Sequence, residues 1–149
     1  MTPRESRHPR GVLNELSRSM EMHFVYAFFF EFGDNVHVKV GESRVPYKRM
    51  QEIAQGCPFP IAAAVFSHIG GFPLARRFEM RFMNTMNHRR TRGEWYCFPK
   101  EEGVEFRQAI ARVYSECTAR PLKWTSIELD EYRAEQLEAA KKWKPHHAA

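Results

Sequence analysis

The residues from Phe24 to Phe30 form a nearly unbroken apolar run whose only hydroxyl belongs to Tyr26. Aromatic and β-branched residues at such density favour a buried β-strand. The residues GDN at 33–35 are typical of a turn, and VHVKV at 36–40 alternates valine with polar residues, as a half-buried strand does. The two segments therefore predict a β-hairpin, with the apolar run as the central strand of a small sheet.

The length of this turn decides which way two polar side chains of the hairpin point. A three-residue loop at 33–35 would direct Tyr26 and Lys39 to opposite faces of the sheet. A loop of two or four residues, or a bulge, would direct both to one face. The sequence leaves both registers open.

The segments that follow the hairpin predict a helix and a third strand. The helix ESRVPYKRMQEIAQG has Ser43 as a candidate cap, Pro46 in its first turn and Gly56 at its end. The apolar residues 59–69 then predict a strand that stops at two glycines.

Three further helices are predicted, at 73–88, 101–117 and 127–143. The first has an apolar residue at every fourth position, which makes one stripe: Leu74, Phe78, Phe82 and Met86. In the second we expect three side chains to face inward: Val104, Ile110 and Val113. Between these two helices, RTRGEWYCF predicts a basic loop that leads into a short strand.

The order of elements predicts an α+β fold, with a small, mainly antiparallel three-stranded sheet flanked by helices. The chain divides into an extension at 1–21, partly disordered or a short helix, and a domain at 22–100. The C-terminal helices at 101–144 pack on this domain, and a tail follows at 145–149. A chain of 149 residues can bury a core of this kind without disulfides or metals.

The three cysteines are odd in number, widely spaced and without a C-x-x-C pair. They argue against a disulfide framework and a zinc ribbon and predict a reduced, cytoplasmic protein. The apolar run is far shorter than the roughly 20 residues of a membrane helix. We therefore expect no membrane partner.

The charge of the chain favours an anionic partner. The formal net charge is +5 and the pI is about 9.3, but such a balance fits solubility alone equally well. The clustering is more specific, because a single glutamate and six arginines lie in one short segment: Arg76, Arg77, Arg81, Arg89, Arg90 and Arg92. This concentration suits phosphate contacts and predicts a nucleic acid, DNA before RNA.

Several short motifs follow one another in a telling order. VYA stands on the first predicted strand and KVG on the second, Arg49 follows Gly41 by eight residues, and Glu79 stands on the long helix before GEWY. The ordered set resembles the GIY-YIG nuclease family. It is most similar to the stand-alone, phage-associated branch with K-[IV]-G and G-E-W-[FY] motifs, and the resemblance covers about residues 23–98.

The resemblance implies a role for each matching residue. Tyr26 matches the tyrosine that lies beside the attacked phosphate and helps to activate water. Lys39 takes the place of the second motif's tyrosine, and Gly41 matches the glycine where the chain bends into the helix. Arg49 matches the arginine that contacts the scissile phosphate, and Glu79 the carboxylate that holds the metal. A structural motif completes the set: Gly93, Glu94 and Trp95.

The chemistry of these side chains agrees with the implied roles. Phosphodiester hydrolysis needs a positioned water and neutralised phosphate charge. Mg²⁺ is commonly held by one or two carboxylates, and an arginine fork suits phosphate. We therefore expect an endonuclease that uses Mg²⁺ or Mn²⁺, with Tyr26, Lys39, Arg49 and Glu79 converging on one concave surface.

Two other functions stay open. Ile53 stands where the GIY-YIG family often has a histidine, which favours a catalytically weak or inactive nucleic-acid-binding module of the same fold. Asn87 and Glu94 are candidates for an asparagine that often follows the glutamate helix. An interaction protein that docks partners on the helices at 101–143 is the third hypothesis. Tyr26 and Trp95 also fit ordinary core packing.

Overall fold

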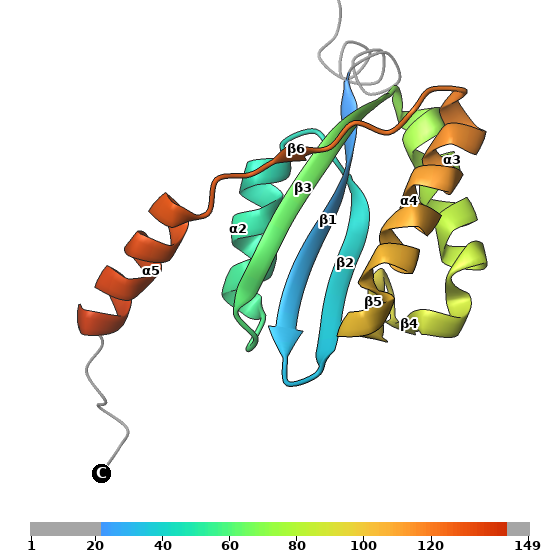
Figure 1. Ribbon diagram of the computed structural model, residues 1–149. Helices are drawn as coiled ribbons and strands as arrows, with labels where there is room; N and C mark the ends of the chain where they lie inside the picture. The colour runs from blue at the N-terminus through green and yellow to red at the C-terminus, as the bar shows by residue number, and fades with distance from the viewer. Residues whose placement is uncertain (1–21, 143–149) are drawn as a thin grey trace, which may run out of the picture.

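The computed structural model describes residues 22–142, which form one antiparallel six-stranded sheet and four α-helices (Figure 1). The strands are β1 (His23–Phe32), β2 (Asn35–Ser43), β3 (Ile61–Gly70), β4 (Arg90–Arg92), β5 (Trp95–Pro99) and β6 (Thr125–Ser126). The helices are α2 (Pro46–Gly56), α3 (Phe72–Thr85), α4 (Gly103–Thr118) and α5 (Asp130–Lys142), with 3₁₀ turns η2 (Asn87–Arg89) and η3 (Lys100–Glu102). The predicted extension at 1–21 and tail at 145–149 lie outside the described residues.

The α+β class and the antiparallel pairing are as predicted, but the expected number of three strands is wrong. The strands run in the order β4-β5-β2-β1-β3-β6. The three long strands and the short strand β5 were predicted as strands, and β4 and β6 are short additions at the two edges of the sheet. Both β4 and β6 consist of exposed polar residues with no alternation. They are strands because they pair with the backbone of a neighbouring strand, which a hydrophobic pattern does not record.

The hairpin has the register that brings the polar residues to one face. Phe32 lies opposite Asn35, so the loop is the two residues between them. Gly33 adopts φ 61°, the left-handed conformation that two-residue hairpin turns favour. Lys39 lies opposite Phe28 and Tyr26 opposite Gly41. Tyr26 and Lys39 therefore share the same face of the sheet.

The two faces of the sheet carry separate cores. Helices α3 and α4 cover one face with a large apolar cluster that includes Val38, Phe78, Phe82 and Ile110. The predicted stripe of α3 is buried there, except that Leu74 is half-buried. Helix α2 and the start of α5 cover the other face, in a cluster that includes Phe28, Met50 and Tyr132. The prediction for Val104 is wrong: it is 68% exposed at the first turn of α4.

The start of α2 differs from the prediction. Ser43 still belongs to β2, and the helix begins three residues later at Pro46. Because proline disfavours the helical conformation in the residue before it, Val45 cannot extend the helix backwards. Ser43 instead accepts a 3.0 Å hydrogen bond from the Val45 backbone N–H across this bend. The helix ends at Gly56, as predicted.

The outer edge of β3 is closed by groups from the C-terminal part of the chain. Ala64 accepts a hydrogen bond from the Ile127 backbone N–H, next to the short pairing with β6. Side chains close the rest, because the Tyr114 hydroxyl donates to the His68 carbonyl and Arg120 to the Ile69 carbonyl, both at 2.6 Å. Arg133 of α5 likewise donates to the Ile61 carbonyl at 3.1 Å. No long row of unpaired backbone groups remains along this edge.

The prediction that no segment spans a membrane can be compared with the helices that the structure describes. Within residues 22–142, none combines the length and the apolar character that a membrane crossing requires. The three cysteines, Cys57, Cys97 and Cys117, are free thiols.

Candidate active site

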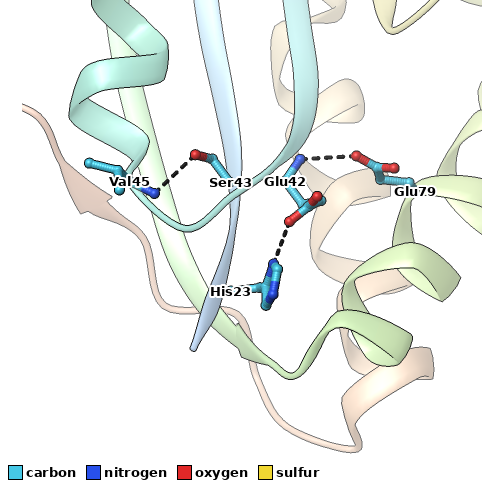
Figure 2. Close-up of polar contacts among 5 residues, drawn as sticks. All are labelled: His23, Glu42, Ser43, Val45 and Glu79. Carbon is cyan, nitrogen blue, oxygen red and sulfur yellow. Dashed lines mark hydrogen bonds and ion pairs between the residues drawn. The ribbon is translucent and has the colours of Figure 1, made fainter. Parts of the chain in front are cut away.

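One half of β2 has an edge without a strand partner. Strand β5 pairs with β2 only as far as Lys39. Beyond that point two glutamates take up the backbone N–H groups. Val40 donates to the main-chain carbonyl of Glu94 at 3.1 Å, and Glu42 donates to Oε1 of Glu79 at 3.1 Å (Figure 2). Glutamates from β4–β5 and from α3 thus meet at the free end of β2.

Gly41 lies between these two contacts and leaves room for polar atoms. A Cβ at this position would lie 2.5 Å from Oε2 of Glu94 and 2.6 Å from the hydroxyl oxygen of Tyr26. Both distances are too short for real contacts, so any side chain here would displace one of the two groups. The glycine of the KVG motif therefore allows Tyr26 and Glu94 to meet over β2.

The hydroxyl of Tyr26 is buried and directed at Arg49. The ring is 1% exposed and stacks on Phe28 at 4.2 Å between centroids. A side-chain hydrogen bond with Tyr26 raises the pKa of Arg49. Burial, and then the charge of Glu94, raise the pKa of the Tyr26 phenol. At neutral pH Tyr26 is therefore a neutral hydrogen-bonding group beside a cation.

The GEWY motif supplies a turn, a carboxylate and a support. Gly93 adopts φ 56°, the left-handed conformation that places it in the turn between β4 and β5. Glu94 follows at once, with Oε2 at 3.8 Å from Nζ of Lys39. The same ammonium lies 5.7 Å from the centre of the Trp95 ring, and Trp95 packs against Phe30. Glu94, predicted as a motif residue and as one candidate for the family's asparagine, thus lies beside Lys39 and Tyr26 in the site itself.

Among the carboxyl groups of the site, Glu79 has the most strongly shifted pKa. Burial raises the pKa of its carboxyl most, and the charges of Glu94 and Glu42 raise it further, to about 7. The hydrogen bond from the Glu42 backbone and the charge of Arg76 lower the pKa but do not offset this rise. The charge of Glu79 also contributes to the raised pKa of Tyr26. Glu79 therefore lies within electrostatic reach of each of these groups.

The expectation of a single concave face is wrong in one respect. Helix α3, which carries Glu79, lies on the opposite face of the sheet from α2, which carries Arg49 (Figure 1). The side chains reach the free edge of β2 from both sides, because β5 stops short and leaves the edge open. The predicted residues Tyr26, Lys39 and Arg49 share one face, and Glu79 meets them around the strand edge.

A contact between a histidine and a glutamate adjoins the site and was not predicted. Nδ1 of His23 lies 2.6 Å from Oε2 of Glu42, whose backbone N–H holds Glu79 (Figure 2). His23 is 3% exposed and contacts the ring of Phe72, the first residue of α3. One residue, Glu42, therefore connects His23 to Glu79. The two partners are 19 residues apart in no recognisable motif, so only the hairpin register could have revealed them.

The six predicted phosphate-binding arginines do not form one group. Arg81 is paired with Glu116 of α4 at 2.5 Å, and Arg89 is paired with Glu102 of η3. Arg76 and Arg77 lie exposed on α3, and two more lie exposed on β4: Arg90 and Arg92. Two of the six arginines therefore form ion pairs that connect α3 to α4 and η2 to η3.

The small number of metal-binding side chains in the site limits how a cation would be held. Within residues 22–142, no three His, Cys, Asp or Glu side chains are grouped as a metal centre. The half-buried carboxylates Glu79 and Glu94 repel each other, as the raised pKa of Glu79 shows. A site with one or two carboxylates fits Mg²⁺, which keeps several waters and takes substrate oxygens as further ligands.

Comparison with known proteins gives one match. A family described as the T5orf172 domain matches residues 23–111, from the first residue of β1 into α4. This domain is phage-associated and of a nuclease-like or nucleic-acid-binding kind. Neither the curated proteins nor the solved structures contain a significant match. Since the matched residues make up more than half of the sequence, the chain belongs to the T5orf172 domain family.

Proposed function

We propose that the protein is an endonuclease of the GIY-YIG type that hydrolyses DNA phosphodiester bonds with Mg²⁺ or Mn²⁺. The observation that carries the proposal is the meeting of Tyr26 and Glu94 over Gly41, with Arg49 as the hydrogen-bond partner of the phenol and Glu79 held by the backbone N–H of the neighbouring Glu42. At this position only a glycine leaves room for both oxygen-bearing groups. The nuclease-associated family supports the same conclusion.

Arg49 and Lys39 provide the positive charge that a phosphodiester requires. Both lie on the Tyr26 face of the sheet, and each faces a carboxylate: Glu52 at 3.6 Å from Arg49 and Glu94 at 3.8 Å from Lys39. Pairs at these distances, partly open to solvent, are weak enough to exchange partners. A phosphate bound here would take over the Arg49 fork and stabilise the charge that develops on its oxygens.

Tyr26 positions the attacking water. Its pKa is raised by burial, so the phenol keeps its proton and acts through hydrogen bonds rather than as a tyrosinate base. Arg49 is the hydrogen-bond partner of the phenol, and a bond donated by its guanidinium would leave the Tyr26 O–H to donate to a water in the space over Gly41. Glu94 lies in the same space and is the carboxylate best placed to take a proton from that water.

Glu79 would hold the cation from the other side of the strand edge. A bound Mg²⁺ or Mn²⁺ would neutralise charge on the phosphate and on the leaving oxygen. The backbone N–H of Glu42 fixes one oxygen of Glu79 at 3.1 Å and leaves the other for a ligand. The raised pKa of Glu79 agrees with this role, because a cation relieves the repulsion among the carboxylates.

Cleavage of supercoiled plasmid DNA tests the proposal. The native protein should nick or linearise the plasmid in Mg²⁺ or Mn²⁺ and not in EDTA, and Glu79→Ala should abolish the cutting. Glu131→Ala, an exposed acid on α5, is the matched control and should cut normally. Metal-independent cutting, or cutting by Glu79→Ala at the native rate, would contradict the assignment.

A binding module without catalysis is the second candidate. Ile53 occupies the position where the GIY-YIG family often has a histidine, and its side chain packs against the apolar cluster around Tyr26. No imidazole is therefore available at that position of α2. Salt-sensitive DNA binding by both the native protein and Glu79→Ala, with cutting by neither in any metal, would establish this alternative.

A further inference from the structure

An open groove of about 920 Å³ begins at the candidate active site and runs along the end of the sheet. It lies where β1 starts, where β2 ends and where α2 and α3 begin. Residues of both faces line it, since Arg49 comes from α2 and Glu42 from the α3 side. A ligand in this groove would therefore reach both halves of the site described above.

More cationic than acidic side chains line the groove. Its walls contribute Arg44, Lys48 and Arg49. Its two carboxylates already have cationic or imidazole partners within the protein: Glu42 is held by His23, and Glu52 lies 3.6 Å from Arg49. The charge pattern favours an anionic occupant with repeated charges, such as a phosphate backbone.

The remaining lining is apolar and aromatic. Phe24 and Phe72 are half-buried, and each ring is braced from behind by an aromatic contact: Phe66 at 5.5 Å for Phe24, and His23 at 5.8 Å for Phe72. Val45 is 55% exposed and Met22 is 57% exposed. Exposed apolar side chains of this size, grouped beside basic ones, mark an interaction surface rather than a solvated face.

The wall of the groove is ordered before any ligand arrives. The bend between β2 and α2 is fixed by the hydrogen bond from the Val45 N–H to Ser43, and the opposite wall by the His23–Glu42 pair (Figure 2). Because these contacts hold the backbone, little ordering is required on binding.

We propose that this groove binds a single strand of nucleic acid next to the scissile phosphate. The phosphates contact Arg44, Lys48 and Arg49, and unpaired bases lie against Phe24 and Phe72. Aromatic rings beside a basic track are how proteins hold single strands, because every base has a face to stack. The proposal rests on the proposed function, since it takes the groove as the approach to the Glu79 site, and it predicts a preference for substrates with an unpaired segment.

Fluorescence anisotropy with a labelled 12-nucleotide thymidine strand tests the groove, using the full chain in EDTA so that nothing is cut. Lys48→Ala should weaken binding severalfold and reduce the slope of log affinity against log salt by about 0.7, the value for one lost single-strand phosphate contact. Phe24→Leu keeps the apolar volume but removes the stacking face. It should weaken binding about fivefold or more without changing the slope.

Two matched variants serve as controls. Phe59→Leu changes a half-buried phenylalanine at the far end of the sheet, where its ring contacts Phe32 and His37. Lys142→Ala removes an exposed lysine at the end of α5. Both should bind the strand like the native protein. The single-strand proposal would be overturned if all four variants bound the strand equally. It would also be overturned if Lys48→Ala and Phe24→Leu weakened binding to a blunt 20-base-pair duplex as much as binding to the strand.

The same variants separate this inference from the catalytic one. If the native protein cuts no substrate but Lys48→Ala and Phe24→Leu still lose strand binding, the groove stands and the nuclease proposal fails. If the protein cuts and both variants keep the native KM on a substrate with an unpaired segment, the groove proposal fails alone.

Discussion

The free edges of β3 and β2 are closed in two different ways. Along β3, donors from Tyr114, Arg120 and Arg133 satisfy backbone carbonyl groups. Along the end of β2 the partners are glutamates, one through its main chain and one through its carboxylate. Each solution satisfies the backbone, but only the second brings acids together.

The electrostatic consequence separates the two edges. The donors of the β3 edge contact neutral backbone carbonyl groups, whereas the β2 edge holds the half-buried carboxylate of Glu79, whose pKa is raised to about 7. A half-buried carboxylate beside two other carboxylates costs stability, and a fold that needed only to cap a strand would use a neutral side chain. We therefore propose that the β3 edge serves the fold and that the β2 edge serves to bind a ligand.

The largest effect is expected at the β2 edge from Glu79→Gln. This change keeps the size of the side chain and an oxygen to accept from the Glu42 N–H, but removes the charge. Cleavage should fall about 10³-fold or more, the upper range for loss of one electrostatic contact to a transition state. Single-turnover cleavage of a labelled DNA measures the rate, and Glu116→Gln on α4 is the control. A rate near the native one would place the metal elsewhere.

Gly41→Ala should come next. The added Cβ would lie 2.5 Å from Glu94 and 2.6 Å from the Tyr26 hydroxyl, so one group must move. Displacement of about 1 Å can reduce a rate about 10²-fold. Gly56→Ala is the matched control, because a Cβ there meets nothing within 4 Å. If the two alanine variants cleave equally, the meeting of Tyr26 and Glu94 over Gly41 has no catalytic role.

His23→Ala should give a smaller loss at the same edge. Without the imidazole, the Glu42 side chain loses its 2.6 Å contact, and the backbone that holds Glu79 is less constrained. Mutation of a residue that supports a metal ligand in this way typically lowers metal affinity or activity about 10- to 100-fold. The Mg²⁺ concentration for half-maximal cleavage should rise, whereas His37→Ala at the far end of the sheet should leave it unchanged. An unchanged Mg²⁺ requirement in His23→Ala would show that the pair only stabilises the fold.

Tyr114→Phe examines the β3 edge in isolation. Loss of the hydroxyl leaves the His68 carbonyl without this donor and should destabilise the fold by about 1 kcal/mol. Urea unfolding measures the change, and cleavage per folded molecule should match the native rate. A loss of cleavage without a loss of stability would mean that the two edges are not separate in function.

The smallest effect concerns pH in the absence of metal. The carboxyl of Glu79 has a folded pKa of about 7 against an ordinary value of 4.5, so the folded state binds the proton more tightly than the unfolded state. Its contribution to stability is therefore present in full below pH about 4.5 and is lost as the pH rises through about 7. Thermal unfolding should show Glu79→Gln gaining stability relative to the native protein over this range. A constant difference would show that Glu79 is not perturbed.

Strong periodic patterns made much of this fold predictable. The stripe of Phe78 and Phe82 on α3 and the apolar strand β1 reflect burial, which sequence records directly. The short strands β4 and β6 were missed because backbone pairing forms them, with exposed side chains of no particular pattern. Val104 was misplaced because the helix turned out to start at Gly103, and its first turn faces solvent.

The candidate site was partly predictable for a related reason. Tyr26, Lys39 and Arg49 share a face once the hairpin loop is two residues long, and that loop length decides the register. The central place of Glu94 and the His23–Glu42 pair depend on where β5 stops pairing with β2, which no local pattern encodes. These parts of the site therefore depend on contacts between residues far apart in the sequence, which the motifs do not contain.

The position of a bound divalent cation is the strongest evidence for or against the proposed mechanism. Crystals of the protein grown with Mn²⁺ and a short DNA strand would reveal the metal by its anomalous scattering. We expect one peak in direct contact with a Glu79 oxygen at the free edge of β2, beside Gly41. A bound strand with the peak away from Glu79, or with no metal at this edge, would contradict it.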